Sequence, residues 1–75
     1  MMGIKEEVLK RLREKYPAGT RIGLIEMDDC QAPPVGTLGT VTEVDDMGNL
    51  HVNWDNGSCL AVIYGVDTVE KVCGL

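Results

Sequence analysis

The chain has 75 residues, with 12 acidic side chains, 7 basic side chains and a formal net charge of −5. This length is below the usual ~100–200 residues of a domain, so we expect one small domain. No apolar run approaches the ~18 residues of a membrane helix, and the charged start lacks the apolar stretch of a signal peptide, so we expect a cytoplasmic protein with no membrane partner.

Residues 4–16 have the pattern of an amphipathic helix. Apolar side chains recur there at intervals of three and four residues, and Pro17 ends the pattern. The charge changes sign along the chain: residues 1–21 hold six bases and three acids, whereas residues 22–75 hold one base and nine acids. The helix therefore carries a candidate basic face, formed by Lys10, Arg11 and Arg13.

From Thr20 onward, short apolar runs alternate with turn residues, which is typical of β-structure. The expected strands are 20–27, 38–44, 49–54, 58–64 and 67–73, with an irregular loop at 28–36. Five short strands in about 55 residues favour a bent barrel over an open sheet. The predicted fold is mainly β with one N-terminal α-helix: residues 1–19 form the helix and a turn, and residues 20–75 form a small SH3-like five-stranded barrel, together one structural domain.

The Asn56-Gly57 dipeptide predicts a β-hairpin, because a type I′ turn requires positive φ at both central residues. A turn centred on this dipeptide predicts the following pairs: Trp54 with Cys59, Val52 with Ala61, and Leu50 with Ile63. The opposite face of the hairpin would then carry His51, Asn53, Leu60 and Val62.

The three cysteines do not form a recognisable metal site. A structural zinc site needs four ligands, usually with two in close spacing, and the chain has no CxxC motif. We therefore expect no metal and no other cofactor. Cys59 and Cys73 are interpreted as small core residues, Cys30 as an exposed thiol, and His51 as a surface residue of a strand.

The acidic pairs Asp28-Asp29 and Asp45-Asp46 fit neither a calcium loop nor a carboxylate dyad. An EF-hand needs oxygen ligands at alternate positions, and adjacent side chains on a strand point to opposite sides. We interpret both pairs, and Asp55, as turn residues whose carboxylates bond nearby backbone. Because the spacing assembles no catalytic group of residues, we expect a protein that is not an enzyme.

Trp54 has two interpretations that the sequence leaves open. An exposed Trp beside an irregular acidic loop is typical of a peptide-docking surface. Alternatively, Trp54 shares the strand parity of Leu50 and Val52 and belongs to the core. On the first interpretation, the candidate partner-binding residues are Asp28, Asp29, Pro33, Pro34, Trp54 and Asp55.

Several short motifs between residues 12 and 67 are shared with a known family. They are Met27-Asp28-Asp29, Ala32-Pro33-Pro34, Gly36-Thr37, Gly39-Thr40-Val41, Val44-Asp45-Asp46, Gly48 and Trp54-Asp55-Asn56-Gly57-Ser58. On these motifs the chain resembles the DUF4314 family of small proteins from Gram-positive bacteria and their phages. The resemblance implies a bacterial or phage origin and brings no established activity. More loosely, the chain is similar to peptide-binding SH3-like modules of the Mind bomb type, and residues 36–44 are similar to a KOW motif.

The leading hypothesis is a non-enzymatic interaction module that docks an unknown protein or peptide, through loop 28–36 and Trp54 or through helix 4–16. The alternative is RNA or ribosome association through the basic face and the KOW-like stretch. A homo-oligomer is a further alternative, because the apolar stripe of helix 4–16 must be covered by its own barrel or by another chain. A third hypothesis is an acidic decoy that mimics nucleic acid.

Overall fold

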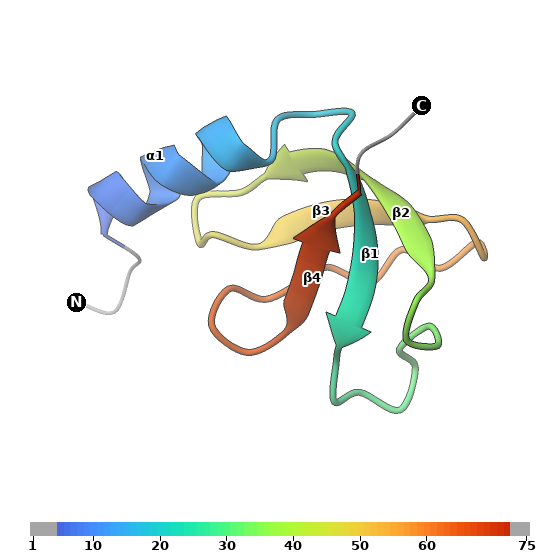
Figure 1. The fold of residues 1–75 in the computed structure, drawn as a ribbon. Helices are drawn as coiled ribbons and strands as arrows, with labels where there is room; N and C mark the ends of the chain where they lie inside the picture. Colours follow the sequence, from blue (N-terminus) through green and yellow to red (C-terminus); the bar gives the residue numbers. More distant parts are fainter. Residues whose placement is uncertain (1–4, 73–75) are drawn as a thin grey trace.

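The structure, a computed structural model that describes residues 5–72, contains one helix and four strands (Figure 1). In chain order they are α1 (Glu6–Lys15), β1 (Arg21–Glu26), β2 (Leu38–Val44), β3 (Leu50–Trp54) and β4 (Thr68–Lys71). The predicted helix and four of the five predicted strands are therefore confirmed, and β2 has both of its predicted ends. Ile4 and Cys73, at the ends of the predicted elements, lie outside the described residues.

Helix α1 forms because its sequence favours both ends of a helix. Glu6 and Glu7 lie in the first turn, where they interact favourably with the helix dipole, and Arg13 and Lys15 lie in the last turn. The helix ends at Tyr16, whose N–H donates to the carbonyl oxygen of Leu12 at 2.8 Å. The residue before a proline avoids helical backbone angles, so Pro17 accounts for this end.

The four strands form one antiparallel sheet in the order β3-β2-β1-β4. Two of them contain a β-bulge, at Ile25 in β1 and at Thr42 in β2, where the pairing register shifts by one residue. The bulge in β2 has a clear effect on the core. Val41 and Val44 would point to opposite faces of a regular strand, but the extra residue brings both into the buried interior.

The predicted hairpin register is wrong by one residue. Val62, not Ile63, pairs with Leu50, through backbone hydrogen bonds of 2.9 and 2.8 Å. The turn after Trp54 has three residues rather than two, since Trp54 N–H donates to the carbonyl of Ser58 at 2.9 Å. Only Gly57 in this turn has positive φ (+94°), so the type I′ turn that was predicted does not form.

The prediction of a five-stranded SH3-like barrel is also wrong: the four-stranded sheet is not closed. Residues 58–64 contribute the single bridge at Val62 instead of a strand. The Trp54 indole N–H donates to the carbonyl oxygen of Leu60 at 2.9 Å, which holds the backbone at Leu60 against the edge of the indole ring. Cys59 is consequently exposed, contrary to its predicted place in the core, while Cys30 is exposed as predicted.

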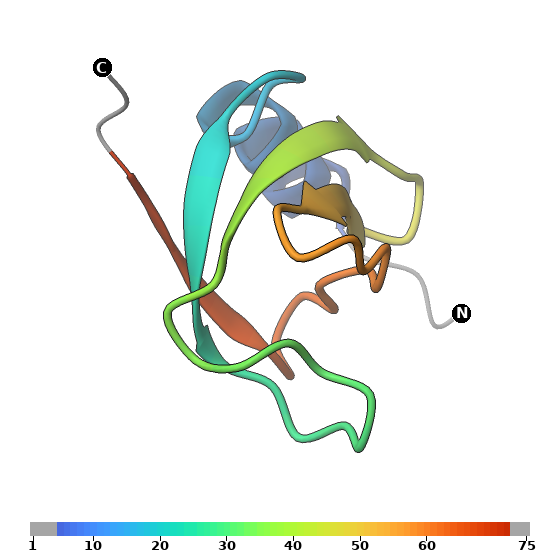
Figure 2. The same ribbon diagram turned by 90° about the vertical axis from the view of Figure 1, so that its right-hand side faces the viewer.

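Helix α1 packs on its own sheet. Figure 1 shows the helix beside the carboxyl end of β2, and Figure 2 shows it lying against the curved sheet. Tyr16 is buried, and Leu9 and Leu12 pack against the core. Part of the apolar stripe predicted for the helix, Leu9, Leu12 and Tyr16, thus contacts the core of its own chain. The buried core consists of Tyr16, Ile22, Leu24, Val41, Val44, Leu50, Val52, Trp54 and Val62.

Gly39 allows β2 and β3 to pack closely. A Cβ atom at this position would lie 2.7 Å from both Trp54 Cε3 and Val52 Cγ1. We expect Gly39→Ala to lower the free energy of unfolding by about 1–3 kcal/mol, because the added methyl group overpacks the core. Urea denaturation checks this prediction. Gly23→Ala is the matched control, since its nearest neighbour would be a Leu38 side-chain carbon at 3.4 Å. Equal denaturation midpoints for the two variants would contradict the prediction.

Candidate functional site

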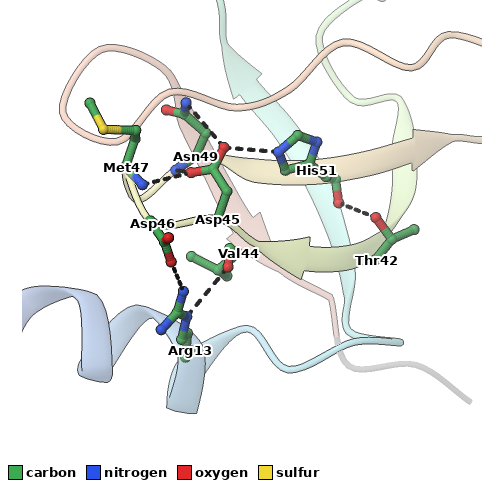
Figure 3. Close-up of polar contacts among 8 residues, drawn as sticks. All are labelled: Arg13, Thr42, Val44, Asp45, Asp46, Met47, Asn49 and His51. Carbon is green, nitrogen blue, oxygen red and sulfur yellow. Dashed lines mark hydrogen bonds and ion pairs between the residues drawn. The ribbon is translucent and has the colours of Figure 1, made fainter.

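The turn between β2 and β3 is organised by the side chain of Asp45 (Figure 3). Its Oδ1 atom accepts hydrogen bonds from the backbone N–H groups of Met47 at 2.9 Å and Asn49 at 3.0 Å. This confirms the interpretation of Asp45 as a turn residue, because an Asp side chain that bonds nearby backbone N–H groups stabilises a tight turn.

His51 extends this turn network onto β3. Its Nε2 atom lies 2.9 Å from Asp45 Oδ2, and Thr42 Oγ1 donates to the His51 carbonyl at 3.1 Å (Figure 3). The His51 side chain is half-exposed, in agreement with its predicted place on the surface of a strand. The hydrogen bond to His51 is the main cause that lowers the pKa of the Asp45 carboxyl; the N–H groups of Asn49 and Met47 act in the same direction, and desolvation opposes them.

Arg13 connects α1 to the same turn. Its Nη2 atom forms an ion pair with Asp46 Oδ1 at 2.9 Å, and its Nε–H donates to the Val44 carbonyl at 3.3 Å (Figure 3). Arg13 is therefore engaged within the chain, whereas Lys10 and Arg11 are exposed and form no ion pair with another of the described residues. The predicted basic face is thus reduced to two residues. An exposed pair such as Arg13–Asp46 contributes at most about 1 kcal/mol.

The Asp45 network predicts a pH dependence of stability. A carboxyl whose pKa is lowered in the folded state stabilises the protein above its unfolded pKa, and this stabilisation is lost as the pH falls through the folded value. We expect Asp45→Asn to destabilise the chain near neutral pH, and the difference from the natural chain to shrink below about pH 4. Urea unfolding from acid to neutral pH measures it. A difference that stays constant over this range would contradict the prediction. Asp45→Ala, which also removes the turn hydrogen bonds, should cost about 1 kcal/mol more at every pH.

The predicted partner-binding residues of loop 28–36 differ in exposure. Asp28, Asp29 and Pro34 are exposed, but Pro33 is buried. Asp29 Oδ1 accepts the N–H of Gln31 at 2.8 Å, so its carboxylate stabilises a turn, as was predicted.

The other two predicted binding residues are engaged within the fold. Trp54 is 3% exposed, which decides between its two interpretations: it is a core residue. Asp55 lies in the turn after β3, as predicted, but its carboxylate bonds a distant side chain instead of nearby backbone. Its two carboxylate oxygens accept hydrogen bonds from Arg21 at 2.9 and 2.6 Å, and Arg21 lowers the pKa of the Asp55 carboxyl. The turn is instead stabilised by Asn56, whose Oδ1 accepts the N–H of Ser58 at 3.0 Å.

A groove that the sequence analysis missed lies between the carboxyl end of α1 and residues 62–69. Its cavity volume is about 230 Å³. The floor is apolar and comes from four parts of the chain, and the rim is more polar. The lining residues are Leu12, Lys15, Tyr16, Leu50, Val62, Tyr64, Gly65, Asp67, Thr68 and Val69. These residues are far apart in the sequence, so no local motif marks the groove; the helical stripe that contains Leu12 and Tyr16 was the one available signal.

The groove has exposed apolar side chains beside it. Tyr64 is 50% exposed, and the neighbouring Val66 is 68% exposed. On the helix side, the Lys15 ammonium lies 5.4 Å from the centre of the Tyr16 ring, a cation–π distance. On the opposite side, Asp67 Oδ2 accepts the N–H of Ile63 at 2.9 Å. The result is an apolar hollow with one cation and one hydrogen-bonded carboxylate at its edge.

The fold and the groove define a small α+β domain, in which one helix packs against the end of an open antiparallel sheet. The chain belongs to the family described as "Domain of unknown function (DUF4314)", whose model matches residues 5–72, nearly the whole chain. This confirms the resemblance found in the sequence motifs. No curated protein and no solved structure matches the chain. Within residues 5–72, no group of three or more His, Cys, Asp or Glu side chains is placed to hold a metal ion, and no helix has the length and apolar character needed to span a membrane.

Proposed function

We propose that this chain is a small protein-binding domain, not an enzyme, that receives a segment of a partner protein in the groove between α1 and residues 62–69. The observation that carries the proposal is the apolar hollow with Tyr64 and Val66 exposed beside it. Single exposed apolar residues are ordinary on protein surfaces. Tyr64 also lines an apolar hollow, and a further exposed apolar residue, Val66, follows two positions later, which is a grouping of the kind that binds a partner.

The size of the groove favours a peptide over a small-molecule cofactor. Its 230 Å³ is below the roughly 300–1,000 Å³ of typical small-molecule sites. A hollow of this size suits one or two side chains of a longer segment. Tyrosine is also enriched at the centres of protein interfaces, because it supplies a large, stiff contact area and a polar end. The bacterial or phage origin and the cytoplasmic location expected from the sequence complete the proposal.

Selection from a displayed library of random peptides tests this function. We expect selected peptides to lose at least tenfold in affinity for Tyr64→Ser, since an exposed aromatic contact is removed and the core is untouched. Met47→Ser is the matched control, because Met47 is also an exposed apolar residue but lies in the turn between β2 and β3. A library that gives no peptide whose binding depends on Tyr64 would contradict the proposal.

The alternative of RNA association stays a prediction and has its own test. The RNA hypothesis predicts binding of an oligoribonucleotide at about 50 mM salt that weakens as the salt concentration rises. Salt-sensitive binding that is lost in Lys10→Glu with Arg11→Glu, and kept in Tyr64→Ser, would favour the RNA hypothesis instead.

A further inference from the structure

We infer that the segment bound in the groove is an extended strand of the partner, which pairs with the outer edge of β4 and carries one acidic residue toward Lys15 and Lys71. This inference rests on the proposed function and specifies its binding mode. Addition of a strand to a sheet edge combines main-chain hydrogen bonds with pockets for alternate side chains.

The outer edge of β4 has backbone groups available for such pairing. β4 is the end strand of the sheet, next to β1, and Figure 2 shows it at the margin of the fold. The N–H of Val72 donates to the Arg21 carbonyl at 2.9 Å, so these two residues form a hydrogen-bonded pair. In an antiparallel ladder, hydrogen-bonded and non-hydrogen-bonded pairs alternate, so the pairs Ile22–Lys71 and Leu24–Val69 are not hydrogen-bonded to each other. Val69 and Lys71 therefore direct their N–H and C=O groups away from β1. Within residues 5–72, no backbone group outside the sheet bonds to them.

The other end of the sheet is different, because its edge is already used. The outer edge of β3 pairs with the chain itself at Leu50–Val62, and the N–H of Trp54 donates to Ser58. Among the described strands, β4 is thus the one that presents a continuous unpaired edge.

The open edge and the groove adjoin on the same face of the sheet. Val69 pairs with Leu24 and Lys71 pairs with Ile22, and both of these partners are fully buried. The side chains of Val69 and Lys71 therefore point to the core side, where Val69 lines the groove. A strand laid along β4 would direct every second side chain toward the groove.

The charges around this face select the chemistry of the strand. Lys15 and Lys71 form no ion pair with another of the described residues. Glu70 lies on the opposite face, beside Gly23 and Leu38, and Asp67 already accepts a backbone N–H. The groove side of β4 is therefore cationic, although the whole chain has a net charge of −5. A single carboxylate on the partner strand would be attracted by the two lysines. The rest of the strand should be uncharged, because a strongly acidic partner would be repelled by the net negative charge of the whole chain.

The probe is a capped synthetic peptide of alternating valine and threonine that ends in one glutamate. Backbone N-methylation at every second residue blocks hydrogen bonding along one edge of the peptide only. Two versions of the peptide are compared, one methylated at the odd-numbered residues and one at the even-numbered residues. We expect one version to lose at least tenfold in affinity for the full chain and the other version to bind with unchanged affinity. Binding should also protect the amide protons of Val69 and Lys71 from exchange, as followed by NMR.

Charge reversal tests the acidic residue. Lys15→Glu and Lys71→Glu should each weaken binding of the glutamate-ended peptide several-fold and strengthen binding of a lysine-ended version. Lys10→Glu is the control, since this exposed lysine lies on α1 and does not line the groove. Equal effects of all three variants would overturn the assignment of the carboxylate.

The outcomes separate this inference from the proposed function. If library peptides bind in a Tyr64-dependent way while both methylated versions of the probe bind equally, or the probe does not bind, strand addition is wrong and the binding groove stands. If Val69 and Lys71 are protected without peptide in concentrated, dimeric protein, the occupant is a second copy of the chain and the inference of a separate partner is overturned. If nothing binds through Tyr64, the proposed function itself fails.

Discussion

Replacing Trp54 by alanine should remove a large part of the stability of the domain. Trp54 is 3% exposed and packs between Gly39 and the segment that follows β3. Truncation of a buried aromatic side chain costs about 3–5 kcal/mol. A domain of this size has a total stability of only about 4–11 kcal/mol. Far-UV circular dichroism and NMR dispersion measure the folded fraction without relying on tryptophan fluorescence.

Trp54→Phe separates packing from hydrogen bonding. Phenylalanine retains much of the apolar volume but removes the indole N–H that donates to Leu60. The Leu60 carbonyl then loses its donor, which costs about 1–3 kcal/mol. We expect this variant to stay folded with a lower urea midpoint. If Trp54 were an exposed docking residue, both substitutions would change stability by less than about 0.5 kcal/mol, and that result would contradict its place in the core.

Tyr16→Ala has the second-largest expected effect, because Tyr16 is the buried side chain that joins α1 to the core. Its removal should cost about 3–5 kcal/mol and release the helix from the sheet. An isolated helix of ten residues is marginal in water, so helical circular dichroism should fall as well. Thermal unfolding and the signal at low temperature measure the two effects.

The chain provides a matched control of the same residue type. Tyr64 is half-exposed beside the groove, and Tyr64→Ala should change stability by less than about 0.5 kcal/mol. If Tyr16→Ala and Tyr64→Ala had the same melting temperature, the helix would contribute no stability through Tyr16. The comparison also matters for the proposed function, since Tyr16 forms part of the groove floor and Tyr64 stands at its edge.

The candidate site could be predicted in part. The apolar stripe of the helix contains Leu12 and Tyr16, which form one wall of the groove. The other wall comes from Val62 to Val69, where the sequence analysis expected a fourth and a fifth strand of a barrel. The predicted docking residues Trp54 and Asp55 are instead used for the fold, in the core and in the ion pair with Arg21. Tryptophan and aspartate occur both at binding surfaces and in contacts that stabilise a fold, so the residue type alone does not show which role a side chain has.

The sequence by itself determined the elements that depend on near neighbours in the chain. The helix follows from its apolar spacing, its charged ends and Pro17, and the turn at Asp45 follows from a carboxylate within reach of its own backbone. The tertiary structure decided whatever depends on a contact between distant residues. The indole of Trp54 holds Leu60, and the three-residue turn places Val62 rather than Ile63 in the core. A change of one residue in a turn reverses which side chains of the following segment are buried. Beyond this one bridge at Val62, residues 58–64 form no strand, so the sheet keeps four strands and stays open, and Val62 lines the groove instead.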